Sequence, residues 1–227
     1  MIKPLSLLKI SREYGGELYS ALMPDGAVDV SIDAISTDTR QVNPGDLFVA
    51  LAGENYYAHD YLQEAVDKGA TALVVSLGAR QKLKSLALCS VSVWLVADTV
   101  VALGQLAQYQ RRFLNGTLVA ITGSCGKTTV KGMLANVFIA AFDATKVFFT
   151  LGNFNNHIGV PLSLLAISDK HVCAVIEMGA SGPGEIKYLT AIAKPTIVMV
   201  NNVMPAHVEG FGSIDGIAVA KGEIYQS

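Results

Sequence analysis

The stretch Ile121-Thr-Gly-Ser-Cys-Gly-Lys-Thr-Thr129 decides the fold of the second half of this chain. It follows an apolar segment that predicts a buried strand over residues 117–122, and it opens a segment that predicts a helix over residues 127–141. In such a strand–loop–helix unit, glycines let the backbone fold around phosphate oxygens. Lys127 adds a positive charge for the phosphates, and the Thr128 hydroxyl is placed to ligate Mg²⁺. We therefore predict a phosphate-binding loop that consists of Gly123, Ser124, Cys125, Gly126, Lys127, Thr128 and Thr129.

The loop departs from the usual pattern G-x-x-x-x-G-K-[ST], because Ile121 holds the position of the first glycine. What remains is the shorter Gly123-x-x-Gly126-Lys127-Thr128. A glycine-rich turn with an incidental lysine is the alternative, and the strand before the loop and the helix after it argue against that alternative. The helix is expected to pack through one apolar face that consists of Val130, Leu134, Val137 and Phe138.

Two further polar positions follow predicted strands. Glu177 ends the strand expected over residues 172–177, and a carboxylate at the carboxyl edge of a parallel sheet can hold Mg²⁺. A solvated acid at the end of a strand is the alternative for Glu177. His207 lies in a glycine-bearing loop after the strand expected over residues 196–203, and a ligand contact and a structural role are equally supported for it.

Asparagines and one lysine complete the set of candidate residues. Asn155 and Asn156 precede a predicted helix, where their amides either cap the helix or bind a ligand carboxylate or phosphate. Lys221 lies on the apolar face of a helix that Ser213 is expected to cap. Burial would favour its neutral amine, which can add CO₂ to form a carbamate, but the residues alone favour a side chain that reaches solvent.

The chain is predicted to be an α/β protein with two domains, residues 1–98 and 99–227, and a boundary near Asp98. In the first domain, strands are expected over residues 28–35, 46–51, 71–76 and 91–97, and helices over residues 60–69 and 81–86, with a further helix over residues 103–113 leading out of it. In the second, strands are expected over residues 117–122, 147–150, 172–177 and 196–203, and helices over residues 127–141 and 158–167. This alternation predicts a parallel sheet covered on both faces. The thin second sheet leads us to expect a part of a longer protein.

Composition limits the class of protein. Of the 227 residues, 51% are hydrophobic and 16% are charged, which excludes a disordered chain, and the net charge of −2 leaves no basic surplus for nucleic acid. Apolar runs are shorter than the roughly 18 residues that span a bilayer, and we see no signal peptide, so we expect a cytoplasmic protein without membrane insertion. Cys89 and Cys173 are expected to be buried, whereas Cys125 is expected to alkylate readily and to be protected by ATP.

These motifs together resemble the Mur ligase family, the ATP-dependent amide-forming ligases of peptidoglycan precursor synthesis. The family's phosphate loop normally has the short form found here. The other stretches that carry the resemblance are Ser36-Thr-Asp-Thr-Arg40, Gly45-Asp-Leu-Phe-Val-Ala-Leu51, Gly152-Asn-Phe-Asn-Asn-His-Ile-Gly-Val-Pro161, Glu177-Met-Gly179, Ala206-His-Val-Glu-Gly-Phe-Gly212 and Ala220-Lys-Gly-Glu-Ile224. The resemblance implies a small mixed α/β domain that binds a uridine nucleotide, followed by a truncated P-loop ATPase domain with a parallel sheet.

The resemblance also implies the chemistry of an amide ligase. A substrate carboxylate attacks the γ-phosphate of ATP to give an acyl phosphate, and an amine then displaces phosphate. By family position, Thr128 and Glu177 hold one Mg²⁺, and His207 and a carbamylated Lys221 serve a second. Lys127, His207 and Lys221 are the residues that the resemblance assigns to catalysis.

Partners follow from the same resemblance. The asparagine-rich stretch and the His-x-Glu-Gly-Phe-Gly motif are most similar to members that join D-alanyl-D-alanine to UDP-N-acetylmuramoyl-tripeptide, and members that add a single amino acid are the nearest competitor. Asn155 and Asn156 are then candidate substrate contacts. Ser36, Thr37 and Arg40 are candidate contacts to the uridine nucleotide, because hydroxyls and a guanidinium suit uracil edges and phosphates, and a structural turn is the alternative.

Two other functions stay open at this point. The chain could be a module that only binds the UDP precursor, or it could belong to an unrelated P-loop kinase or GTPase. No Asn-Lys-x-Asp guanine motif occurs in the sequence, which weakens the GTPase reading. We expect a monomer that does not complete ligation by itself, because the family's third domain is absent from these 227 residues.

Overall fold

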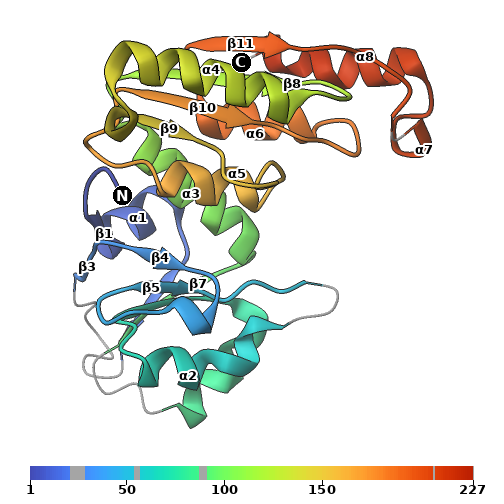
Figure 1. Ribbon diagram of the computed structural model, residues 1–227. Coiled ribbons are helices and arrows are strands. Elements are labelled where there is room, and N and C mark those ends of the chain that lie inside the picture. Colours follow the sequence, from blue (N-terminus) through green and yellow to red (C-terminus); the bar gives the residue numbers. More distant parts are fainter. Residues whose placement is uncertain (21–28, 54–56, 87–90, 207, 227) are drawn as a thin grey trace. The chain divides into compact units, whose positions relative to one another are not determined.

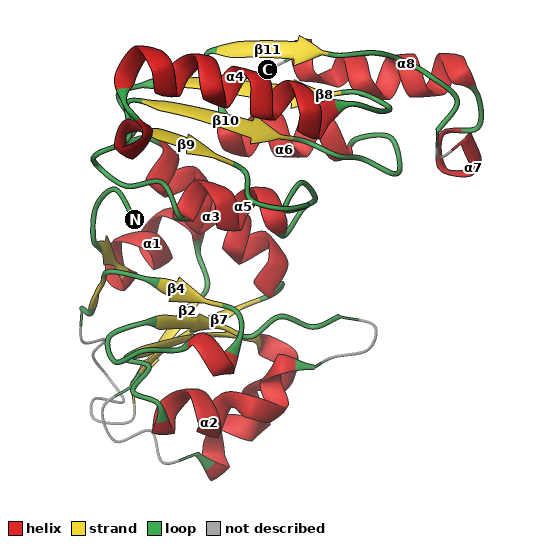
Figure 2. Cartoon of the chain, in the orientation of Figure 1, coloured by secondary structure: helices red, strands yellow, loops and turns green. Residues whose placement is uncertain are grey.

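Figures 1 and 2 show the computed structural model, which describes residues 1–20, 29–53, 57–86, 91–206 and 208–226. The chain divides into two compact units. Unit 1 consists of Lys3–Leu106 together with Met1, and unit 2 consists of Ala107–Ser227 together with Ile2. The division falls within helix α3 (Thr99–Arg111), whereas the sequence places a boundary just before this helix.

Unit 1 contains a sheet in the strand order β2-β7-β6-β5-β4, whose members are β2 (Glu17–Ser20), β4 (Ile35–Ser36), β5 (Leu47–Val49), β6 (Ala72–Ser76) and β7 (Ser92–Val96). All neighbouring pairs are parallel except β2 and β7. A separate antiparallel pair joins β1 (Leu5–Ser6) to β3 (Ser31–Ile32). The helical segments described in this unit are α1 (Leu7–Tyr14), α2 (Leu62–Asp67), the first part of α3 and the 3₁₀ segments Thr39–Gln41, Ala58–Tyr61 and Leu77–Ser85.

The central strands of the unit 1 sheet are apolar and buried on both faces. Phe48, Leu73 and Leu95 from three neighbouring strands pack with Leu62 and Ala65 of α2 in one buried cluster. Burial of such side chains stabilises each by about 1.5–3 kcal/mol relative to exposure. The predicted end of the α2 segment at Gly69 is confirmed, since this glycine has a φ of 95°.

Several expectations for unit 1 need correction. The single strand expected over residues 28–35 is instead β3 and β4, which belong to different sheets because the chain bends at Asp33 between them. The helix expected over residues 81–86 is the second half of the 3₁₀ segment Leu77–Ser85. Helix α3 begins earlier than expected, because the Asp98 carboxylate accepts hydrogen bonds from the first-turn N–H groups of Val100 and Val101.

Unit 2 contains a parallel sheet in the order β11-β8-β10-β9, whose members are β8 (Thr117–Thr122), β9 (Val147–Phe149), β10 (Cys173–Glu177) and β11 (Ile197–Val200). Its helices are α4 (Lys127–Phe142), α5 (Gly159–Leu165), α6 (Glu185–Ala193), α7 (Val208–Phe211) and α8 (Ile214–Gly222), with 3₁₀ segments at Ala144–Lys146 and Glu223–Tyr225. The α4 helix packs on one face, and α5 and α6 pack on the other (Figure 1). The predicted doubly covered parallel sheet is confirmed, and it brings the carboxyl ends of β8, β10 and β11 to one edge.

The α4 face is rotated from the one that the sequence predicts. Val130, Leu134 and Phe138 pack on the sheet as expected, but Val137 is 62% exposed, so its assignment to this face is wrong. The buried stripe runs through positions separated by four residues and widens toward Lys131, which is 4% exposed.

Two predicted features at helix starts are present in unit 2. Pro161 lies in the first turn of α5, and the Ser213 hydroxyl accepts a hydrogen bond from the Gly216 N–H at the start of α8, both as predicted. Helix α6 was not predicted. Across the ranges described above, no helix is long and apolar enough to cross a membrane.

Candidate functional site

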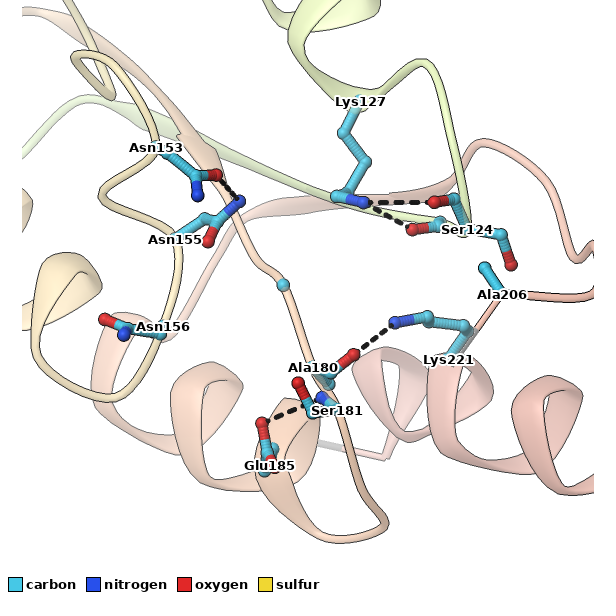
Figure 3. A pocket seen from close by; sticks show the side chains of 12 residues that line it. Ser124, Lys127, Asn153, Asn155, Asn156, Ala180, Ser181, Glu185, Ala206 and Lys221 are labelled. Carbon is cyan, nitrogen blue, oxygen red and sulfur yellow. Dashed lines mark hydrogen bonds between the residues drawn. The ribbon is translucent and has the colours of Figure 1, made fainter. Parts of the chain in front are cut away.

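A cavity of about 340 Å³ lies at the carboxyl edge of the unit 2 sheet (Figure 3). Its walls come from the loops after β8, β10 and β11, the asparagine-rich loop before α5, the first residues of α4 and α6, and α8. The lining residues are Gly123, Ser124, Lys127, Asn153, Asn155, Asn156, Gly179, Ala180, Ser181, Glu185, Ala206 and Lys221. The cavity therefore brings together the predicted phosphate loop, the candidate asparagines Asn155 and Asn156, and Lys221.

The predicted phosphate loop joins β8 to α4 through two glycines with positive φ. Gly123 has a φ of 151° and Gly126 a φ of 73°, and a Cβ on Gly123 would lie 3.1 Å from the Asn202 nitrogen. Among the described residues, no side chain caps the start of α4. Its first N–H groups therefore remain suited to an anion. Lys127 Nζ donates to the Gly123 carbonyl at 2.7 Å, so this ammonium lies over its own loop (Figure 3).

Two asparagines after β11 brace this loop. The Ser124 N–H donates to the Asn202 carbonyl and the Cys125 N–H to Asn202 Oδ1, both at 3.1 Å. Asn201 Nδ2 donates to the Cys125 carbonyl at 2.8 Å. The N–H groups of Ser124 and Cys125 are thus engaged within the protein, and an anion would meet Lys127 and the first turn of α4 instead.

Glu177 is buried and accepts hydrogen bonds from three side chains. Its Oε2 accepts hydrogen bonds from Thr128 Oγ1 at 3.0 Å and from Lys131 Nζ at 3.1 Å, and its Oε1 accepts one from Asn155 Nδ2 at 2.8 Å. Burial would raise the pKa of Glu177, but the hydrogen bonds from Asn155 and Lys131 outweigh burial, and the pKa is lowered. Glu177 is 1% exposed, so its interpretation as a solvated acid at a strand end is wrong.

Lys131 is a candidate site residue that the sequence did not predict. Its side chain is 5% exposed and pairs with Glu177, whose side chain is 2% exposed. A helical spacing of three residues from Thr128 puts both on one face of α4, and that spacing was the available signal. The partner could not be read locally, because Glu177 lies on a different strand.

The two asparagines divide the roles that the sequence left open. Asn156 Oδ1 accepts from the N–H groups of Ile158 at 3.2 Å and Gly159 at 2.8 Å, so it caps the start of α5. Asn155 orients Glu177 and also lines the cavity. Gly179 is tightly placed beside it, since a Cβ there would lie 3.0 Å from the Asn155 side chain.

Lys221 is buried, which corrects the expectation of a side chain that reaches solvent. It is 3% exposed, its Nζ donates to the Ala180 carbonyl at 3.4 Å, and it lies 5.3 Å from the centre of the Phe211 ring. Burial and the nearby Lys127 charge lower the pKa of Lys221. The neutral amine is therefore easier to reach than for a lysine in water.

One metal-site expectation receives no geometry, because His207 lies outside the described residues. The expected burial of Cys89 also falls outside them. In the part of the chain that the structure describes, no three His, Cys, Asp or Glu side chains are grouped as they would be around a metal ion. The oxygens of Thr128 and Glu177 do meet at one point, and hard oxygen ligands suit Mg²⁺.

Cysteine placement agrees with the sequence where it is described. Cys173 is 1% exposed within β10, and burial raises the pKa of its thiol. Cys125 is exposed, with its Sγ 3.5 Å from Met204 Sδ.

Unit 1 has its own cavity, of about 530 Å³, lined by Thr37, Asp38, Thr39, Arg40, Tyr61 and Glu64. Arg40 Nη2 lies 2.6 Å from Asp38 Oδ2, and the hydrogen bonds from Arg40 lower the pKa of Asp38 to about 2. Ser36 does not line this cavity. Its Oγ donates to the Asp38 carbonyl at 2.8 Å, which is the structural turn that the sequence left as an alternative.

Comparisons with known proteins agree with both units. Residues 121–227 match the family model described as the Mur ligase middle domain, and residues 31–111 match the model described as the Mur ligase family, catalytic domain. The chain belongs to the Mur ligase family. The resemblance inferred from the motifs is thereby confirmed.

Two relatives of this Mur ligase chain have the same name. UDP-N-acetylmuramoyl-tripeptide–D-alanyl-D-alanine ligases are 49% identical over 202 residues in Haemophilus influenzae and 41% identical over 221 residues in Escherichia coli. These matches cover 88% and 97% of this chain but 43% and 45% of the relatives. The Mur ligase chain therefore spans less than half the length of these curated relatives.

Solved structures of MurF are also similar to this chain. MurF from Acinetobacter baumannii superposes on this Mur ligase chain with a TM-score of 0.84 and 34% identity, and the match covers 99% of this chain and 47% of that one. MurF ligase from Thermotoga maritima in complex with ADP has a TM-score of 0.74 and 36% identity, with 84% and 42% covered.

Proposed function

We propose that this chain is the amino-terminal and central part of an ATP-dependent ligase that joins D-alanyl-D-alanine to UDP-N-acetylmuramoyl-tripeptide in peptidoglycan precursor synthesis. The observation that carries the proposal is the phosphate loop next to the hydrogen-bonded pair of Thr128 and the buried Glu177, in a chain whose relatives bear the name of that ligase. We assign nucleotide binding to residues 99–227 and binding of the UDP precursor to residues 1–98. We also propose a cytoplasmic monomer.

The physical problem of this reaction is charge. A substrate carboxylate must approach the γ-phosphate of ATP, and both groups are anionic. Lys127, together with the uncapped first turn of α4, offsets this repulsion by binding phosphate oxygens. For this to happen, Lys127 leaves the Gly123 carbonyl, which costs a hydrogen bond to a neutral acceptor and gains one to an anion.

The Thr128–Glu177 pair fits a divalent cation, because it offers a hydroxyl and a carboxylate oxygen within 3.0 Å of each other. Mg²⁺ held there would stabilise negative charge on the transferring phosphoryl group. We assign His207 and a carbamate on Lys221 to a second cation. The lowered pKa of Lys221 supports this assignment, since CO₂ adds to a neutral amine.

We assign the precursor's uridine nucleotide to the cavity of unit 1. Thr37 and Arg40 line it, and the Arg40 guanidinium suits a diphosphate. Asn155 and Asn156 line the cavity of unit 2, and we assign them to the precursor's reactive end. The amide that forms there takes its carbonyl from the precursor and its nitrogen from D-alanyl-D-alanine.

Calorimetric titration of the 227-residue chain tests the proposal. We expect tighter binding of UDP-N-acetylmuramoyl-tripeptide than of the matching dipeptide, and binding of ADP with Mg²⁺. Equal affinity for the two precursors would contradict tripeptide specificity in this chain, and failure to bind either would contradict the role of residues 1–98. Arg40→Ala should weaken binding of the precursor and leave the affinity for ADP unchanged. Lys146→Ala, at an exposed lysine, should change neither affinity.

A further inference from the structure

Lys131 carries an ammonium group that is buried beside a carboxylate assigned to a cation. Its Nζ lies 3.1 Å from Glu177 Oε2 and 3.3 Å from the Gly152 carbonyl. A buried charge without a partner is strongly unfavourable, so this pair is held together in the state that the structure shows.

The hydrogen-bond donors around Glu177 differ in whether they can also ligate a cation. The Thr128 hydroxyl donates to Glu177 Oε2, but it also has lone pairs, so it can turn and become a cation ligand. The Lys131 ammonium has donors only and cannot ligate a cation. A cation that binds between Thr128 and Glu177 Oε2 must therefore share Oε2 with a positive charge or displace that charge.

We propose that Lys131 is a positioning residue that acts as the internal counter-ion of Glu177, and that it makes cation binding at Thr128 and Glu177 depend on a bound nucleotide. The inference rests on the proposed function for the cation and the nucleotide. A divalent cation that arrives alone is repelled by the Lys131 ammonium, whose side chain is 5% exposed and is therefore poorly screened by water. Polyphosphate oxygens bring negative charge and additional ligands, and together they offset this repulsion.

Electron paramagnetic resonance with Mn²⁺ as the probe measures this dependence on the 227-residue chain. Free Mn²⁺ is titrated with and without ADP, after subtraction of the Mn²⁺–ADP complex that forms in solution. For the wild type, we expect ADP to raise Mn²⁺ affinity more than tenfold. By reciprocity, Mn²⁺ should raise ADP affinity by the same factor, which calorimetry checks.

Lys131→Gln is the decisive variant, because it removes the charge and keeps an amide donor for Glu177. We expect it to bind Mn²⁺ without ADP at least tenfold more tightly than the wild type, and to lose a matching part of the coupling to ADP. Lys131→Arg keeps the charge and should behave as the wild type. Lys146→Gln is the matched control at an exposed lysine, and addition of Glu177→Gln to Lys131→Gln should remove the gained affinity.

Three outcomes overturn the proposal. Lys131→Gln, shown to be folded by circular dichroism, binds Mn²⁺ no more tightly than the wild type. The gained affinity survives Glu177→Gln, which would place the cation elsewhere. The wild type binds Mn²⁺ equally well with and without ADP although ADP binds, and this result needs no variant at all. If ADP does not bind the wild type, the proposed function fails, whereas the comparison of free Mn²⁺ binding between wild type and Lys131→Gln still decides the counter-ion role.

Discussion

Replacement of Glu177 by glutamine should destabilise unit 2 strongly, although the side chain keeps its size. The substitution leaves the Lys131 ammonium, in a side chain that is 5% exposed, without its counter-ion. It also replaces one of the two acceptor oxygens by an NH₂ group, although Asn155 Nδ2 already donates a hydrogen bond to this side chain. Loss of one partner of a buried ion pair costs about 3–5 kcal/mol, and we expect a loss of unfolding free energy in that range.

Hydrogen exchange followed by mass spectrometry measures this loss where it occurs. A change of about 3–5 kcal/mol corresponds to exchange that is about one hundred to several thousand times faster in peptides from β10 and α4. Trp94, fully buried in β7, reports unit 1 through its fluorescence and serves as the internal control. Asp169→Asn, at an exposed acid in unit 2, is the matched charge-removing variant and should change exchange little.

The stability difference between wild type and Glu177→Gln should depend on pH in a defined direction. The folded-state pKa of Glu177 is lowered below its ordinary value of 4.5, so its contribution to stability is present above pH 4.5 and is lost as the pH falls through the folded pKa. The difference between wild type and Glu177→Gln should therefore be constant from pH 7 to about pH 5.5 and narrow at lower pH. Equal exchange in the two proteins at pH 7, or a difference that does not narrow in acid, would refute the reasoning.

Three smaller predictions concern the phosphate loop and the start of α5. Lys127→Ala should weaken ADP binding about 10- to 100-fold in calorimetry, as expected for one charge-assisted hydrogen bond, and should leave the melting temperature unchanged because Lys127 contacts carbonyls of its own loop; unchanged affinity would contradict this. ADP with Mg²⁺ should slow alkylation of the exposed Cys125, read by peptide mass spectrometry with the buried Cys173 as internal control, and equal rates with and without nucleotide would rule out protection. Asn156→Ala should lower the unfolding free energy of unit 2 by about 1 kcal/mol in denaturant titration, and Asn156→Asp should retain the cap; an equal loss in both variants would count against capping.

Much of unit 2 could be predicted from the sequence because its strands are short, continuous apolar runs. The strand expected over residues 117–122 has the same bounds as β8. Unit 1 was harder, because β2 pairs antiparallel with β7 and its existence depends on a partner far along the chain. Helix α6 was missed because its start depends on Glu223, whose carboxylate accepts from the Gly184 and Lys187 N–H groups.

The candidate site shows the same division between local and long-range information. The phosphate loop and Glu177 could be named from the sequence, since each follows an apolar strand. The burial of Lys131 and Lys221 could not, because a lysine on a helix ordinarily lies in solvent. Here Lys131 meets Glu177 from β10, and Lys221 meets the Ala180 carbonyl from the loop after β10.

The acceptors of the three lysines at this edge suggest a division of labour. Lys127 and Lys221 rest on backbone carbonyls, which are neutral acceptors, whereas Lys131 rests on a carboxylate. An incoming polyphosphate competes more easily with a carbonyl than with a buried carboxylate, because hydrogen bonds between charged groups are about twice as strong as neutral ones. Lys127 is therefore the ammonium that exchanges its acceptor for phosphate, and Lys131 is the one that stays. Removal of Lys127 should then weaken nucleotide binding, whereas removal of the Lys131 charge should strengthen binding of the free cation. These opposite effects distinguish the two lysines, although they are only one helical turn apart.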